Sequence, residues 1–277
     1  MQKRRFLIGI IIIVGILAVS CSNFRQIQKS IDWRVKYEAA LDYYNDGDYY
    51  KAVTLFEEIL PFVKTEKEGE TVLFYYAYCF YRYKNQYVLS AHYFKNFSQT
   101  YSRSQYAEEA YYMHAYSLYR QSPLFNLDQS STKEAVANMQ NFLNRYPNSE
   151  YSDKASKVID ELQVKLELKA YETSKQYYRL TKYKSAVVAF KNFESDFPDS
   201  DFIEEIRFLK IDAQYSLAKL SVFAKQKERY LEAINYYEEF IDRYPESEYI
   251  NTAENIYGDS QSELRKIVKI EKNISNL

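Results

Sequence analysis

Apolar residues recur along the chain with the spacing of one face of an α-helix, and the same spacing returns several times. One set has offsets 0, 4, 7, 11 and 12: Ala135, Met139, Phe142, Tyr146 and Pro147. Steps of 4, 3 and 4 place apolar side chains on one helical face, and the proline ends the helix. Two later sets keep these offsets: Ala186, Phe190, Phe193, Phe197 and Pro198, then Ala233, Tyr237, Phe240, Tyr244 and Pro245.

A short phrase closes each of these helices: "RYPNSEY" (145–151), "DFPDSDF" (196–202) and "RYPESEY" (243–249). We interpret the phrase as a joint between two helices, with its two aromatics packing across the turn. The serine two positions after the proline suits the N-cap region of the next helix, and these serines are Ser149, Ser200 and Ser247. Weaker copies are Ser90, Phe94, Phe97 and Tyr101, with Ser102 replacing proline, and Ala52, Phe56 and Ile59, with an early Pro61.

The five copies begin at residues 52, 90, 135, 186 and 233, and a second helix precedes each one. In "YEAALDYYNDGDYYKA" (37–52) small Ala39 and Ala40 precede Gly47-Asp48-Tyr49 and Ala52, which resembles the tetratricopeptide (TPR) repeat. Such helix pairs bury their apolar faces only by stacking into a solenoid. The predicted fold class is therefore all-α, a TPR-like α-solenoid of about five helix-turn-helix repeats. Residues 151–181 contain no Gly or Pro and read as one long helix or a helix pair.

The N-terminus has the pattern of a secretory signal. "MQKRR" is basic, and the apolar run Phe6–Val19 is too short to span a bilayer comfortably. Leu17-Ala18-Val19-Ser20-Cys21 resembles the lipobox of bacterial lipoproteins, which implies cleavage before Cys21 and acyl chains on its thiol and amino group. The alternative is an ordinary signal peptide with a cysteine by chance. Ser22 stands where Asp would retain many lipoproteins in the inner membrane, so export to the outer membrane is expected.

These patterns divide the chain into four parts: a lipoprotein signal peptide (1–20), a lipidated tether (21–31), TPR repeats 1–3 (32–147), and repeats 4–5 with a terminal helix (148–277). The sequence leaves open whether the terminal helix, 249–270, caps the solenoid or binds a partner.

Composition argues against catalysis and against nucleic acid. The chain is 47% hydrophobic, and 37 basic residues balance 38 acidic ones, without a basic stripe. Two histidines and five glycines provide neither a metal site nor a phosphate-cradling loop. We therefore expect no enzyme, no metal and no cofactor. His92, His114 and acid pairs such as Glu57-Glu58 and Glu204-Glu205 are interpreted as solvated helix faces, and Cys79 as a buried small residue.

The first helix of each repeat is expected to line a concave groove that binds a peptide. Tyrosine offers a large contact area and a hydroxyl, which suits an extended segment with aromatic side chains. A core or plain surface position remains equally compatible with each single residue. The predicted inward residues are Tyr37, Leu41, Tyr44, Tyr75, Arg82, Met113 and Arg120, with Cys79 and Ser117 in the same register.

The lipobox, the five TPR-like units and the joint phrase together resemble the BamD family, outer-membrane lipoproteins of the β-barrel assembly (BAM) machinery. The resemblance extends from Ile31 to about Leu264. It implies a lipid-anchored protein on the periplasmic face, whose first repeats receive unfolded outer-membrane proteins by their C-terminal β-signal. Its last repeats would dock on a POTRA domain of BamA, beside other BAM lipoproteins. Arg82 or Arg120 would meet a terminal carboxylate of the client.

Other classes of lipoprotein remain open at this point. A TPR scaffold lipoprotein could organise cell-wall, secretion or gliding machinery. A nutrient-importing outer-membrane lipoprotein is a third option, but such proteins are usually longer and richer in Trp and Gly. The single Trp33 argues against this third option.

Overall fold

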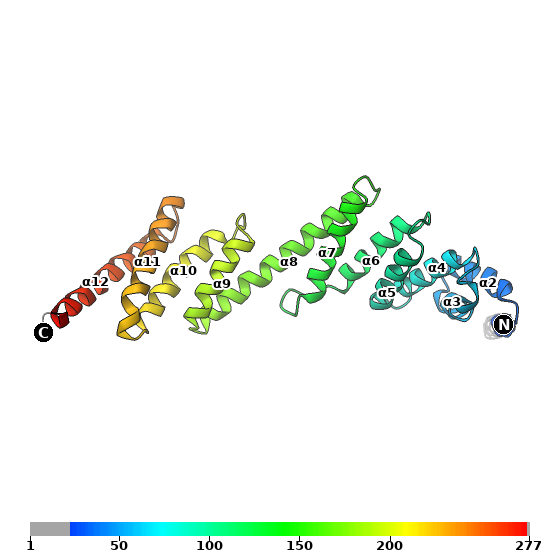
Figure 1. The fold of residues 1–277 in the computed structure, drawn as a ribbon, viewed down its shortest axis with the longest axis horizontal. Helices are drawn as coiled ribbons and strands as arrows, with labels where there is room; N and C mark the ends of the chain where they lie inside the picture. The colour runs from blue at the N-terminus through cyan, green and yellow to red at the C-terminus, as the bar shows by residue number, and fades with distance from the viewer. Residues whose placement is uncertain (1–22, 276–277) are drawn as a thin grey trace, which may run out of the picture. The chain divides into compact units, whose positions relative to one another are not determined.

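The computed structural model describes residues 23–275, and all regular structure in this range is α-helical, which confirms the predicted fold class. Successive helices pack against each other from α2 to α7 and again from α9 to α12, and α8 contributes side chains to the cores on both sides (Figure 1). The helices are α2 (Trp33–Asn45), α3 (Tyr49–Val63), α4 (Gly69–Arg82), α5 (Tyr87–Thr100), α6 (Ala107–Gln121), α7 (Ser130–Arg145), α8 (Ser152–Arg179), α9 (Tyr183–Asp196), α10 (Ile203–Lys219), α11 (Phe223–Arg243) and α12 (Ile250–Ser275).

The chain forms two compact units, the first ending at Leu162 and the second beginning at Gln163. The core of the first unit runs from α2 to the start of α8, where Ala155, Val158 and Leu162 join it. The core of the second unit begins at Tyr171 on α8 and continues through α9 to α12. One uninterrupted helix of 28 residues, α8, thus serves both units, which settles the two readings of residues 151–181. The division into repeats at residue 147 remains a prediction.

The predicted signal peptide, 1–20, and Cys21 lie outside the described residues. Within the stretch 21–31, residues 23–28 are helical. The Phe24 ring lies 5.7 Å from the ring of Tyr43 on α2, and Ile27 also packs against the first core. None of the helices in the described part of the chain is long and apolar enough to cross a membrane.

The joints between repeats share one backbone geometry. At the joint before α8, the Tyr146 N–H donates to the Phe142 carbonyl (2.8 Å) and the Ser149 N–H to the Tyr146 carbonyl (3.2 Å). The Ser149 hydroxyl then accepts a bond from the Tyr151 N–H (3.1 Å). The serine therefore caps the turn itself, ahead of the helix, rather than acting as N-cap residue. The same three bonds recur at the joints that end in Tyr106, Phe202 and Tyr249.

The two aromatics of a joint contact different rings, in contrast to the predicted packing across the turn. The first ring stays on its own helix, as Tyr146 does at 5.6 Å from Phe142. The second ring, which precedes the first helix of the next repeat, stacks on an aromatic ring in the first helix of the repeat before the joint. These stacked pairs are Phe74–Tyr106 (4.4 Å), Tyr112–Tyr151 (4.6 Å), Tyr171–Phe202 (4.1 Å) and Phe208–Tyr249 (4.6 Å).

Some polar residues interpreted as solvated surface are structural. Glu58 pairs with Lys36 at 2.5 Å and accepts a bond from Gln28, so it ties α3 to α2 and to the N-terminal turn. Glu205 pairs with Lys175 at 2.7 Å and ties α10 to α8. His114 is buried, with 7% of its surface exposed, and only His92 lies on the surface as predicted. Each of these three side chains meets a partner on another helix, so a helix position that is polar in sequence is not always solvated.

We expect opposite effects from alanine at two helical glycines. An added Cβ at Gly69, in the first turn of α4, would lie 2.3 Å from the Val63 carbonyl oxygen and 2.8 Å from the Tyr101 hydroxyl. Gly69→Ala should therefore lower the free energy of unfolding by about 1–3 kcal/mol, measured by urea denaturation. A Cβ at Gly258, on α12, meets nothing within 4 Å. Gly258→Ala should raise it by about 1 kcal/mol through helix propensity, and equal effects at both sites would contradict this packing.

Candidate functional site

A tyrosine recurs at one position in the first helix of every repeat. It lies seven residues after an aromatic residue, and those aromatics are Tyr37, Phe74, Tyr112, Tyr171 and Phe208. Seven residues are about two helical turns, so both side chains lie on the same helix face. All five tyrosines are half-buried. We call them the tyrosine ladder: Tyr44, Tyr81, Tyr119, Tyr178 and Tyr215.

The hydroxyls of the last three ladder tyrosines donate to carboxylates two helices further along the chain, on α8, α10 and α12. The Tyr119 hydroxyl donates to Glu161 (2.7 Å), Tyr178 donates to Asp212, and Tyr215 donates to Asp259 (3.1 Å). The bond to Glu161, together with burial, raises the pKa of Tyr119 to about 12. These tyrosines are therefore neutral donors at neutral pH, and their hydrogen bonds hold neighbouring repeats together.

The first two rungs carry no such carboxylate. Asp212 lies four residues after Phe208 on α10. The equivalent position is Tyr78 on α4, two helices after Tyr44, and Tyr116 on α6, two helices after Tyr81. The Tyr44 ring lies 4.7 Å from the ring of Tyr75. The Tyr78 ring is buried and its hydroxyl donates to Glu109. The half-buried rings of Tyr44, Tyr75, Tyr81 and Tyr116 have no carboxylate acceptor among the described residues, and we call these four rings the aromatic strip.

Two exposed arginines end the helices of this strip. Arg120, at the end of α6, donates from Nη1 to the Tyr81 hydroxyl (3.4 Å) and lies 4.8 Å over the Tyr87 ring. Arg82, at the end of α4, lies 5.9 Å from the Tyr81 ring. Neither forms an ion pair within residues 23–275. Both guanidinium groups therefore keep donors for an external carboxylate.

The predicted groove residues fall into two groups. Tyr37, Leu41, Tyr44 and Tyr75 are half-buried, and Arg82 and Arg120 are exposed, so these six present surface to a ligand. Met113 belongs to the core, with 7% of its surface exposed. Their roles as ligand contacts remain predictions. Cys79 is fully buried, as expected, and burial raises the pKa of its thiol.

The predicted groove residues do not include Tyr81, Tyr87 and Tyr116, the three tyrosines around Arg120. Tyr81 and Tyr116 lie on the first helices of repeats, and the seven-residue recurrence from Phe74 would have found Tyr81. Tyr87 lies at the start of α5, a second helix, where the groove register does not apply. No sequence signal identifies Tyr87 as a neighbour of Arg120.

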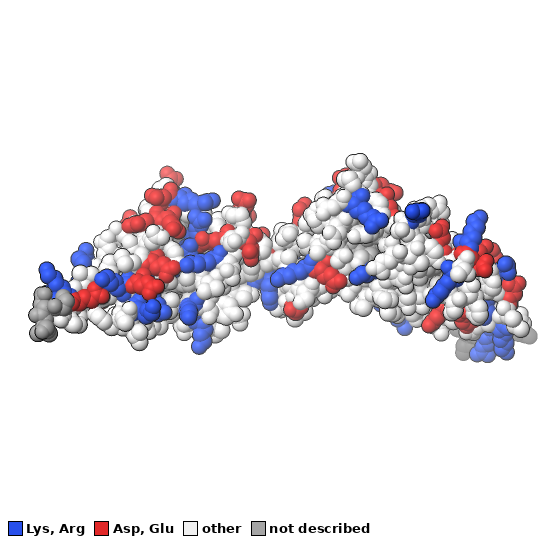
Figure 2. All heavy atoms as spheres, viewed as in Figure 1, with Lys and Arg blue, Asp and Glu red and all other residues white. Residues whose placement is uncertain are grey.

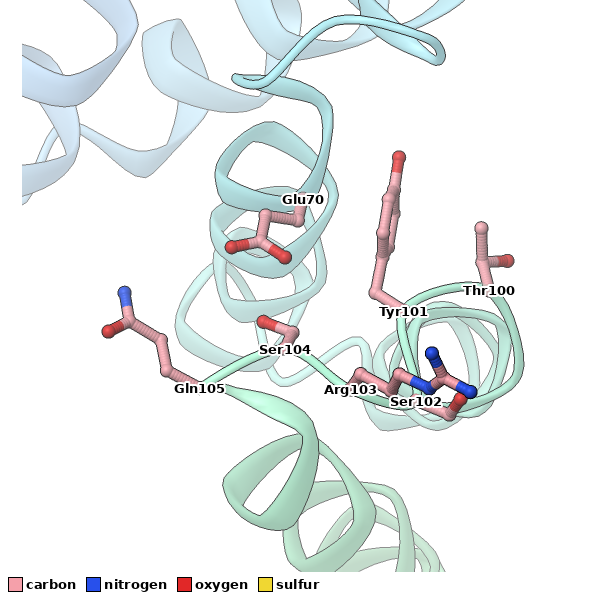
Figure 3. Close-up of a pocket in the computed structure, with 7 residues that line it drawn as sticks. All are labelled: Glu70, Thr100, Tyr101, Ser102, Arg103, Ser104 and Gln105. Atoms are coloured by element: carbon pink, nitrogen blue, oxygen red, sulfur yellow. The ribbon is translucent and has the colours of Figure 1, made fainter.

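Several surface depressions arise from the repeat itself. In the depression of Figure 3, Glu70 of α4 lies across from the joint residues Tyr101 to Gln105. Glu167 faces the joint at Pro198, and Glu204 faces the joint at Pro245, in the same way. Since the arrangement recurs wherever a first helix meets a joint, we regard these depressions as architectural. In the described part of the chain, no three His, Cys, Asp or Glu side chains come together as metal ligands.

The face drawn in Figure 2 carries interspersed basic and acidic side chains. The candidate site is therefore distinguished by its aromatic strip and two arginines, and not by a field of one sign.

Comparison with known proteins identifies two matching family models. Residues 31–205 match YfiO, described as an outer membrane lipoprotein, and residues 212–247 match a tetratricopeptide repeat. No curated protein matches the chain. A solved TPR domain of P58(IPK) is 15% identical, covering 92% of this chain and 67% of that one, with a TM-score of 0.39. The TPR2AB domain of yeast Sti1 in complex with pHSP90 is 11% identical, covering 83% and 98%, with a TM-score of 0.38. TM-scores this low support no inference about ligands.

The closed and open rungs of the ladder should respond differently to loss of the hydroxyl. Tyr178→Phe removes the bond to Asp212 and should lower the free energy of unfolding by about 1–2 kcal/mol. Tyr44→Phe is the matched control, because no carboxylate accepts from its hydroxyl, and its effect should stay below about 0.5 kcal/mol. Urea denaturation measures both, and equal losses would show that the carboxylate does not matter.

Proposed function

The chain belongs to the YfiO family of outer membrane lipoproteins, BamD-like proteins with tetratricopeptide repeats, and on this premise we propose a role in β-barrel assembly. In this proposal the first unit binds unfolded outer-membrane proteins for the BAM complex. The observation that carries it is the open part of the tyrosine ladder, flanked by Arg82 and Arg120, which form no ion pair among the described residues.

The proposed ligand is an extended client segment of alternating side chains with an aromatic residue and a carboxylate at its end. Neutral tyrosine hydroxyls both donate and accept, so they match the N–H and C=O groups of an extended backbone. The half-buried rings of Tyr37, Tyr44 and Tyr75 offer aromatic contact to its side chains. Arg82 and Arg120 would receive the carboxylate through charge-assisted hydrogen bonds.

We assign a different task to the second unit, which would dock on a POTRA domain of BamA beside other BAM lipoproteins. Its ladder hydroxyls are already satisfied by Asp212 and Asp259, so they offer no equivalent receptor. Exposed apolar residues instead gather where α10 turns into α11. Leu220 is 75% exposed, Val222 73% and Phe223 44%. Such a patch is typical of protein interfaces.

The anchor completes the proposal. Acyl chains on Cys21 would hold the protein at the periplasmic face of the outer membrane, because several chains anchor stably where one does not. The short stretch between Cys21 and α2 would then keep the first unit close to the bilayer, where clients arrive.

Removing both arginines should weaken binding of a client peptide. We expect Arg82→Ala/Arg120→Ala to raise the Kd for a peptide ending in an aromatic residue and a free carboxylate by about tenfold or more, since bonds to charged groups contribute about 1.5–3 kcal/mol. Fluorescence anisotropy with a labelled peptide measures this. Arg103→Ala, which removes an exposed arginine elsewhere in the first unit, is the control and should leave the Kd unchanged. Equal affinity of the double variant and the wild type would rule out the carboxylate contact.

Extraction from membranes tests the anchor and the partner together. The full-length chain, extracted in mild detergent, should bring down BamA, because the acyl chains and the second unit hold it there. Cys21→Ser should shift the protein to the soluble fraction and reduce the recovered BamA. Recovery of cell-wall, secretion or gliding proteins without BamA would instead support the scaffold alternative.

A further inference from the structure

A depression of about 330 Å³ between α5, α6 and α7 differs from those that face the joints. The joint-facing depressions are each lined by at least one acid, such as Glu70, Glu167 or Glu204. No Asp or Glu lines this one. The side chains that matter here are Lys95, Ser98, Ser102, His114, Asn138 and Arg145.

Two cations on different helices face this depression without a counter-charge. Lys95 comes from α5 and Arg145 from the end of α7, and neither forms an ion pair within the described residues. The Arg145 guanidinium lies 5.6 Å from the Tyr111 ring and 5.5 Å from the Tyr146 ring, so two aromatic rings hold it in place. Cations that are positioned but unpaired favour an external anion.

The floor of the depression is polar and ordered. His114 is buried, and its Nδ1–H donates to the Ala91 carbonyl (2.9 Å), which fixes the ring. Burial lowers the pKa of His114, so the imidazole is neutral at pH 7 and the positive charge comes from Lys95 and Arg145. Glu134, one turn before Asn138, acts on His114 electrostatically but does not line the depression.

In the second unit, charged side chains occupy the positions that correspond to this depression. Aligning α5 with α9, α6 with α10 and α7 with α11 puts Glu194 at the position of Ser98, and Lys210 at the position of His114. The Glu194 carboxylate pairs with Lys210 at 2.6 Å, and both side chains are largely buried. The second unit therefore supplies both the carboxylate and its cation, whereas the first unit has neither, and Ser98 leaves the place of the carboxylate open.

A second departure from the repeat pattern adds a donor to the same depression. Three joints carry proline at one position, Pro147, Pro198 and Pro245, and the joint after α5 carries Ser102. Proline has no N–H and no hydroxyl, whereas Ser102 has both and lines the depression. Compared with the second unit, the first unit thus has Ser98 in place of a glutamate and Ser102 in place of a proline, and both serines line this depression.

We propose that this depression binds a compact oxyanion, a phosphate or carboxylate group, in the place that corresponds to the Glu194 carboxylate. Lys95 and Arg145 supply the charge, and the hydroxyl of Ser102 supplies a neutral donor. The Asn138 amide is committed to the Glu134 carbonyl (2.8 Å) and lines the wall of the depression. Ser98 makes room for the anion because its side chain is small and uncharged. Its hydroxyl donates to the Phe94 carbonyl (2.9 Å).

Thermal unfolding of the full-length protein in detergent tests the site, with inorganic phosphate or malonate added at constant ionic strength. Either anion should raise the unfolding midpoint as its concentration passes the Kd, since it binds only the folded state. Lys95→Gln/Arg145→Gln should weaken the apparent affinity by about tenfold or more. Arg103→Gln, which removes a charge facing the neighbouring depression, is the matched control and should keep the wild-type response.

A gain-of-carboxylate variant gives the decisive comparison. Ser98→Glu places a carboxylate at the position of Glu194, beside Lys95 and Arg145, so it should raise the midpoint without added anion and abolish the response to phosphate and malonate. A response to phosphate alone assigns the ligand as a phosphate group, and a response to malonate alone assigns a carboxylate. The proposal is overturned if the double variant responds like the Arg103→Gln control, or if Ser98→Glu keeps the full response.

Discussion

The stacked ring pair between successive repeats is the contact on which the rest of the structure depends. A helix pair cannot bury its apolar face alone, so each repeat needs a fixed register on its neighbour. The ring that closes a joint, such as Tyr151 or Phe202, provides that register by stacking on Tyr112 or Tyr171. Aromatic pairs contribute about 0.5–1.5 kcal/mol beyond the area they bury. The three backbone bonds of the joint hold the ring at the required position, so joint and stack form one unit.

The same register decides which polar groups are satisfied inside the protein. Two helical turns after a stacked ring, the ladder hydroxyl reaches the next first helix, where it finds either a carboxylate or another tyrosine. Asp212 accepts a hydrogen bond from Tyr178, which joins two repeats. Where Tyr116 replaces the acid, the Tyr81 hydroxyl instead accepts a hydrogen bond from Arg120. Glu194 and Ser98 show the same contrast in another place. Single residue differences within the same repeat geometry thus distinguish polar groups that are paired inside the protein from polar groups that are open to a ligand.

The helices and joints could be predicted from sequence because their signals are local. The offsets from Ala135 to Pro147 describe one helical face and its end, and the structure has α7 there. The environments of Glu58, Glu205 and His114 could not be predicted, because each depends on a partner on another helix. The local sequence around a polar helix residue does not show whether another helix will pack against it.

The residues of the candidate site could also be predicted only in part. Tyr44 and Arg120 follow from repeat register, but Met113 in the same register lies in the core. Tyr87 reaches Arg120 from a second helix, and spacing within one repeat cannot reveal such a contact.

Helix α8 has a consequence for how the protein comes apart. Leu162 belongs to one core and Tyr171 to the other, and the backbone between them is a single run of helical hydrogen bonds. Melting of either core would expose its end of α8 and fray that run toward the other core. The two cores are therefore linked as neighbouring cooperative segments through shared helical turns, and their denaturation transitions should draw closer together as those turns become more stable.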